Sequence, residues 1–152
     1  MLDIPHVLQT NPGGRNSCVP ACLSMALAHQ GLMLNEKELC DLLDTQPAGT
    51  EVFNIEFLKN HLECQISIEE SSLERLEEQL AAGIPPIVFV STGPLHYWQH
   101  ETIHAIVVTG IEEVIHIHDP ILPQAPQAIS RSVFLAAWSE LGFLSAFVRV
   151  AR

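Results

Sequence analysis

The stretch from residue 103 to 119 constrains the fold of this chain most, because it reads as a β-hairpin that places a histidine opposite an aspartate. Two short apolar runs flank a reversal at residues 110–113. If the turn is symmetric about its centre, His104 and Asp119 are directly opposed on one face. The same register predicts two further opposed pairs, Val108 with Ile115 and Ile106 with Ile117. The carboxylate would then fix the imidazole tautomer and leave the other ring nitrogen free to act as a base.

A thiol lies at a predicted helix start near the N-terminus. Cys18 follows a Gly- and Asn-containing loop and precedes a run whose apolar side chains recur at helical spacing up to Gly31. Asn16 or Ser17 can cap this helix. The positive end of the helix dipole and the unpaired backbone N–H groups favour a thiolate there and can bind an oxyanion. Cys18 is therefore the candidate nucleophile for the histidine and aspartate of the hairpin.

Three segments together resemble a known family: Cys18-Val-Pro-Ala-Cys-Leu-Ser-Met-Ala with Gln9 upstream, His104-Ala-Ile-Val-Val-Thr-Gly-Ile, and His118-Asp119-Pro120. Over most of its length the chain is similar to the bacteriocin-processing (double-glycine leader) peptidase-like family of papain-like cysteine peptidases. The resemblance implies an α+β, papain-like fold with N-terminal helices packed on a C-terminal antiparallel sheet. It further implies Cys18 as nucleophile, His104 as general base, Asp119 as the residue that orients it, and Gln9 as oxyanion-hole donor.

Two positions depart from the pattern of that family. Val19 follows the nucleophile where the family usually has glycine, and Gln9 lies further ahead of the cysteine than usual. Asn11 and Asn16 are therefore alternatives to Gln9 as the side-chain donor to an oxyanion.

Length and hydropathy favour a single domain over residues 1–152, because 152 residues with 47% hydrophobic content suffice for one core. Helices come first and strands mostly last, which is an α+β order. Helices are predicted at about 18–31, 35–43, 50–61, 71–83 and 132–141, and strands at about 64–68, 87–90, 103–108, 114–117 and 143–150. Residues 121–130 carry two prolines and are predicted to be irregular.

Charge and cysteine content limit the partners and the compartment. A formal net charge of −11 disfavours nucleic acid and anionic membrane surfaces as partners. A cationic or neutral peptide fits this charge better, although acidity is also an ordinary route to solubility, and the family resemblance implies a peptide or protein substrate. The N-terminus lacks the pattern of a signal peptide, and no apolar run is long enough to span a bilayer. Four cysteines without a disulfide-rich pattern favour the reducing cytoplasm.

The predicted loop before the hairpin contains two aromatic residues and two histidines. Tyr97 and Trp98 are predicted to line a substrate groove, although they can also cover the core. His96 and His100 recur at a spacing of four with His104, which raises zinc as an alternative. Because Gly93-Pro94 indicates a loop there, no metal or other cofactor is expected.

The sequence thus predicts a cysteine peptidase or amide hydrolase that forms a thioester intermediate on a peptide substrate. A thiol-dependent acyl transferase is one alternative, since transfer and hydrolysis share the thioester. A catalytically silent peptide-binding domain of the same fold is another, and Val19 and the position of Gln9 are the features that favour it.

Overall fold

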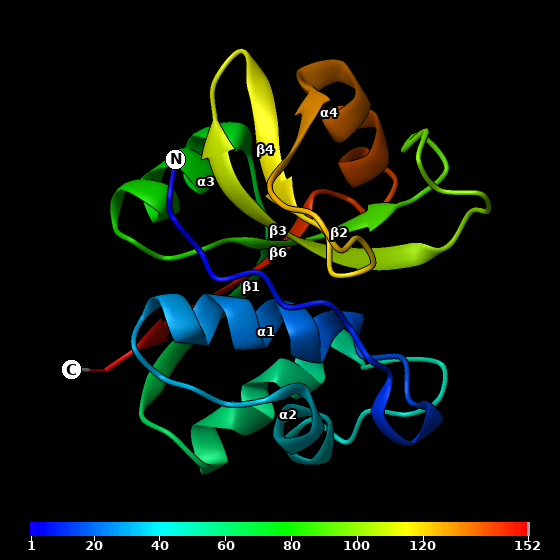
Figure 1. The fold of residues 1–152 in the computed structure, drawn as a ribbon. Helices are drawn as coiled ribbons and strands as arrows, with labels where there is room; N and C mark the ends of the chain where they lie inside the picture. Colours follow the sequence, from blue (N-terminus) through cyan, green and yellow to red (C-terminus); the bar gives the residue numbers. More distant parts are fainter. Residues whose placement is uncertain (152) are drawn as a thin grey trace.

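The computed structural model describes residues 1–151, in which a six-stranded antiparallel sheet has helices on both faces (Figure 1). The helices are α1 (Cys18–His29), α2 (Glu36–Leu42), α3 (Leu73–Ala81) and α4 (Arg131–Ser139), with 3-10 helices η1 (Pro12–Gly14) and η2 (Val52–Asn60). The strands are β1 (Cys64–Glu70), β2 (Ile87–Ser91), β3 (Ile103–Ile111), β4 (Val114–His118), β5 (Gln127–Ser130) and β6 (Leu144–Val150). The predicted α+β class and antiparallel pairing are confirmed.

The strand order is β1-β6-β2-β3-β4-β5, so β2 and β3 lie in the interior of the sheet. Every residue of β2 is buried, as expected for its continuous apolar run. Alternate side chains of these strands enter two separate cores. Phe89, Ala105 and Val107 pack with α1 on one face, whereas Val90 and Ile106 pack with the other core, which α3 and α4 cover.

Helix α1 begins at the predicted residue and is buried along nearly its whole length. It packs on β3, and Figure 1 shows α1 and α2 on one side of the sheet with α3 and α4 on the other. We call the core with α1 and α2 and the core with α3 and α4 the two halves of the molecule. The start of α1 and the start of β3 meet at one end of the contact between these halves.

The register predicted for the hairpin is wrong by two residues. The structure pairs Val108 with Ile117 and Val107 with His118, and the register shifts at a bulge between Val108 and Gly110. A slip of two residues keeps every side chain on its face, whereas a slip of one would have reversed them. Asp119 therefore stays on the predicted face, just beyond the end of β4.

Two other segments differ from the sequence predictions. Residues 52–60 form a 3-10 helix, in which the tighter turns direct Ile55 and Leu58 into the core. The segment predicted to be irregular contains β5, a strand at the sheet edge that pairs with β4. Four residues after two prolines are too short a pattern to reveal a strand in the sequence.

In the described part of the chain, every helix falls short of the length and apolarity required to cross a membrane.

Candidate active site

Cys18 is the first residue of α1 and is only 7% exposed. Its side chain borders a cavity of about 350 Å³ between the two halves, so a ligand has access to the sulfur. Its backbone N–H donates to Asn16 Oδ1 at 3.3 Å, so a side chain two residues upstream satisfies the first N–H of the helix. Of the two predicted caps, Ser17 is the N-cap residue but its side chain makes no capping hydrogen bond, and Asn16 accepts from the first N–H of the helix instead.

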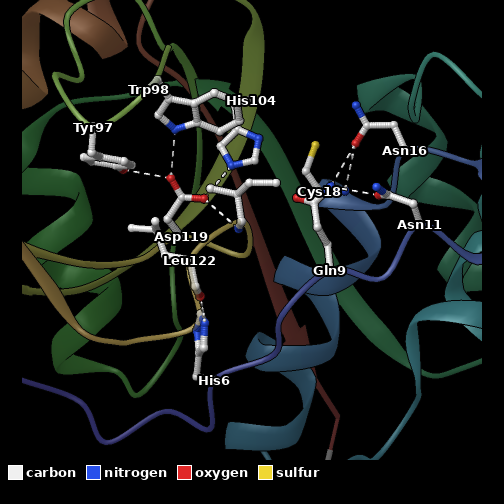
Figure 2. A network of polar contacts seen from close by, with 11 residues as sticks. His6, Gln9, Asn11, Asn16, Cys18, Tyr97, Trp98, His104, Asp119 and Leu122 are labelled. Atoms are coloured by element: carbon white, nitrogen blue, oxygen red, sulfur yellow. Dashed lines mark hydrogen bonds and ion pairs between the residues drawn. The ribbon is translucent and has the colours of Figure 1, made fainter. Parts of the chain in front are cut away.

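His104, near the start of β3, contacts the aspartate that the hairpin predicted. Its Nε2 lies 2.6 Å from Asp119 Oδ1, and both side chains are buried. An ionised carboxylate can only accept, so Nε2 carries a proton and Nδ1 is left for another partner. Figure 2 shows the second ring nitrogen on the side that faces the sulfur of Cys18. The predicted contact between His104 and Asp119 is confirmed, although they are not directly opposed in the ladder.

The two hydrogen-bond partners of His104 change its acidity. Burial lowers the pKa of His104, but hydrogen bonds with Asp119 and Cys18 outweigh it and raise the pKa to about 9. For Asp119, burial raises the pKa, and the hydrogen bond and positive charge of His104 more than offset this, so the pKa is lowered overall. The pair is therefore ionised at neutral pH, with the positive charge on the ring that faces the thiol.

Tyr97 and Trp98 contribute to the site through the aspartate. The Tyr97 hydroxyl donates to Asp119 Oδ2 at 2.7 Å, and Trp98 Nε1 donates to the same oxygen at 3.2 Å. The ring of Trp98 also packs edge-on against His104, with centroids 4.7 Å apart. Burial and the charge of Asp119 raise the pKa of Tyr97, so the phenol stays a donor. Trp98 lines a cavity beside His104, as its predicted role in substrate binding requires, whereas Tyr97 is not among the residues that line the two cavities next to the thiol.

Gln9 reaches the site from the N-terminal segment, residues 2–9, which crosses the molecule in an extended form (Figure 1). Its backbone N–H donates to Pro120 O at 2.8 Å, next to Asp119. Its Nε2 donates to Asn11 Oδ1 at 2.9 Å and to Asn16 Oδ1 at 3.3 Å. Figure 2 shows Gln9, Asn11 and Asn16 grouped around the start of α1. All three amides that the sequence offered as oxyanion donors therefore lie beside Cys18.

A buried carboxylate that sequence reasoning missed holds this loop. Glu36 Oε2 accepts from the Ser17 hydroxyl at 2.6 Å and from the Thr10 backbone N–H at 2.9 Å, and Oε1 accepts from the Thr10 hydroxyl at 3.2 Å. In the sequence Glu36 looks like an ordinary residue of a capped helix start, and no local pattern distinguishes it from the exposed Glu38. Its contacts tie α2 to both ends of the loop before Cys18.

Two cavities flank the reactive groups. The cavity of about 350 Å³ has apolar walls that include Val19, Val52 and Phe89. A second, of about 400 Å³, lies on the side of Gln9 and Trp98. His104 and Asn16 border both cavities, and Cys18 borders the first, so the two cavities adjoin next to the candidate nucleophile. A chain that occupied both would place one of its bonds beside the thiol.

Cys22 is the second cysteine of α1. Cys22, one turn after Cys18, is fully buried, and burial first, then the charges of Cys18 and Asp119, raise its pKa well above the usual value. It packs in the core. Among residues 1–151 no group of three His, Cys, Asp or Glu side chains is arranged to hold a metal ion.

Comparisons with known proteins identify the family of the chain. Residues 1–146 match the model of the Peptidase_C39 like family, and the chain belongs to that family. A search of curated proteins finds no match. The resemblance to bacteriocin-processing peptidases that the sequence motifs indicated is therefore confirmed at the level of the family.

Solved structures show the same fold. A protein of Bacillus anthracis described as a C39-like peptidase has a TM-score of 0.78 at 16% identity, over 99% of this chain and 96% of that one. The peptidase domain of Streptococcus ComA, a bifunctional ABC transporter involved in quorum sensing, has a TM-score of 0.73 at 20% identity, over 95% and 97%. A double-glycine-motif protease of an AMS/PCAT transporter, solved with its leader peptide, has a TM-score of 0.72 at 15% identity, over 98% and 93%. The papain-like fold is thereby confirmed.

Proposed function

We propose that this protein is a cysteine peptidase that cleaves amide bonds in a peptide substrate, with residues 1–152 forming one peptidase domain. The observation that carries the proposal is the bridging position of His104, whose ring bonds Asp119 through one nitrogen and faces Cys18 with the other. A thiol, a base and a carboxylate in this order are the minimum machinery for thioester chemistry.

In the proposed reaction His104 starts as the imidazolium, with one proton on Nδ1, and the Cys18 sulfur attacks the carbonyl carbon of the substrate as the thiolate paired with it. The carbonyl electrons move onto oxygen, where the Cys18 backbone N–H and Gln9 Nε2 bind the oxyanion. His104 then gives its proton to the departing amine as the C–N bond breaks. Water, deprotonated by His104, attacks the thioester and releases the acid and the free thiol. Asp119 stabilises the imidazolium throughout.

A peptide substrate is supported by the two adjoining cavities and by the leader peptide bound to one of the structural neighbours. None of these residues selects water as the group that attacks the thioester, so an amine can attack in its place and the enzyme would then transfer the acyl group. Product analysis with an added amine separates hydrolysis from transfer. A free thiol is required in either case, which supports the predicted cytoplasmic location.

Selective alkylation tests the proposal. Cys64 is the most exposed of the four cysteines, so alkylation governed by exposure would label it first. Burial raises the pKa of Cys64 and of Cys22. We therefore expect iodoacetamide at neutral pH to label Cys18 first, with the modified residue mapped by mass spectrometry after digestion. Equal labelling of all four cysteines, or preferential labelling of Cys64, would contradict an activated thiol at Cys18.

A peptide probe tests the groove and the nucleophile together. The chloromethyl ketone of acetyl-Leu-Gly-Gly should add one mass equivalent to the intact protein, and the adduct should map to Cys18. The Cys18→Ala variant should take up none, and the matched Cys64→Ser variant should react like the wild type. If wild-type protein binds the peptide without forming any adduct, the chain is a silent peptide-binding domain.

A further inference from the structure

The two groups that would bind the oxyanion already share an acceptor. The Cys18 backbone N–H and Gln9 Nε2 each lie 3.3 Å from a single atom, Asn16 Oδ1. This atom is the carbonyl oxygen of an amide, the same chemical group as the oxygen of a scissile peptide bond. Asn16 thus occupies the place that the substrate oxygen must take.

The orientation of these amides follows from backbone donors. The Ser17 backbone N–H donates to Asn11 Oδ1, so the Gln9 atom that also faces Asn11 Oδ1 is the amide nitrogen. The Cys18 backbone N–H likewise requires the oxygen of Asn16 on its side. Gln9 Nε2 and the Cys18 N–H therefore both donate, and Asn16 accepts.

Asn16 is held more loosely than Asn11. Asn11 Oδ1 accepts from Gln9 Nε2, from the Ser17 N–H and from the Ser17 hydroxyl. Apart from its oxygen, the Asn16 side chain makes no hydrogen bond to residues 1–151, and it borders both cavities. When the Asn16 carboxamide rotates away, Asn11 still orients Gln9.

We propose that Asn16 is a built-in occupant of the oxyanion hole, which the substrate carbonyl displaces on binding. The inference rests on the proposed peptidase function and adds an opening step to it. The resting protein keeps both donors satisfied and the helix start capped, and it exchanges the Asn16 oxygen for that of the substrate. Asn16 therefore acts on substrate binding by competition, not as a donor to the oxyanion.

A reversible aldehyde measures this competition directly. Acetyl-Leu-Gly-glycinal forms a hemithioacetal when the Cys18 sulfur bonds the aldehyde carbon and the thiol proton passes to the carbonyl oxygen, which must enter the hole. Its affinity is read from the concentration that halves the rate of iodoacetamide alkylation at Cys18. Alkylation itself is a displacement at carbon that needs no oxyanion hole, so it serves as the internal reference.

Asn16→Ala should bind the aldehyde about two- to tenfold more tightly, because one competing neutral hydrogen-bond acceptor is removed. Asn16→Asp keeps the cap and places a charged acceptor on the same donors, so it should bind the aldehyde more weakly than the wild type. The Asp variant keeps the test valid even if the Ala variant unfolds. The matched variant Asn11→Ala should weaken aldehyde binding, because Gln9 loses its support.

Weaker binding in Asn16→Ala would show that Asn16 donates to the oxyanion, and unchanged binding in both Asn16 variants would show that it does not occupy the hole. Either result overturns the inference. The proposed function fails separately, if the wild-type Cys18 is not alkylated selectively in the absence of aldehyde.

Discussion

Asp119 is fully buried and accepts four hydrogen bonds, two at each carboxylate oxygen. Oδ1 receives His104 and the Ile121 backbone N–H, and Oδ2 receives Tyr97 and Trp98. A buried charge is costly unless its lone pairs are used in this way. The two aromatic residues that the sequence assigned to a groove thus also stabilise the anion that orients the base.

The Asp119→Asn variant should lose both stability and reactivity. An amide NH₂ in place of either oxygen must face two of the four donors, and the imidazolium loses its counter-charge. We expect a loss of about 3 to 5 kcal/mol in the free energy of unfolding and about 10² or more in the rate of labelling by the peptide chloromethyl ketone. Tyr97→Phe, which removes one donor, is the milder comparison. Labelling of Asp119→Asn at the wild-type rate would contradict the role of the pair.

The contact between His104 and Asp119 also makes the free energy of unfolding depend on pH in the alkaline range. The pKa of His104 is raised to about 9 in the folded state, above its ordinary value of 6.5. The folded state therefore holds a proton that the unfolded state releases between these two values. This contribution to stability is fully present below about pH 6.5 and is lost as the pH rises through 9. Urea unfolding between pH 6 and pH 10 should show the decline, and it should be flatter in Asp119→Asn.

Two elements hold the loop that carries the oxyanion donors. The N-terminal segment, residues 2–9, bonds Thr109 O through the Leu2 N–H and Leu122 O through the His6 ring. Helix α2 supplies Glu36, which bonds Thr10 and Ser17. The candidate oxyanion hole is therefore positioned by segments that precede and follow α1, not by α1 alone.

Glu36→Ala should disturb this loop, because it leaves three donors of Thr10 and Ser17 without their acceptor. We expect a loss of about 2 to 4 kcal/mol in unfolding free energy, judged from about 1 to 3 kcal/mol for each unsatisfied buried group. Glu36→Gln keeps an acceptor and should restore most of the stability and of the affinity for the peptide aldehyde. Glu38→Ala, on the exposed side of the same helix, is the matched control. Equal aldehyde affinity in the Glu36→Ala and Glu38→Ala variants would count against the positioning role.

At the scale of the whole molecule, the two cores are separated by one sheet, and the site forms where the two halves meet. Cys18 belongs to the core with α1, and Trp98 packs against the core with α3 and α4. The N-terminal segment joins the halves on the outside, where His6 packs on His118 with ring centroids 5.3 Å apart. Opening of this junction would separate the candidate catalytic groups.

Acid should loosen the junction through His118. Burial first, and then the charge of His6, lowers the pKa of His118 from 6.5 to about 4. The unfolded chain therefore takes up this proton more readily, so stability falls as the pH drops from about 6.5 to about 4. The measurement is unfolding free energy across this interval. The His118→Gln variant, which cannot become charged, should show a smaller slope, and an identical slope would contradict the assignment.

Local patterns were sufficient for much of the architecture and of the site. The helical spacing after Cys18 predicted α1, and the alternation in residues 103–119 predicted that His104 and Asp119 share a face. The bulge at Val108 and Gly110 was not visible, because it depends on how the strands fit the two cores. The prediction that His104 and Asp119 share a face was still correct, because the pairing was wrong by two residues and side chains on a strand alternate with a period of two.

The sequence by itself determined which side chains are candidates for the reaction and how neighbouring ones are directed, because helix and strand periods act over a few residues. Only the tertiary structure decided that Cys18 meets the ring of His104, that Glu36 is buried, and that Asn16 fills the space between two donors. Those contacts join segments whose mutual distance is set by packing the cores on both sides of the sheet. No local propensity carries that information.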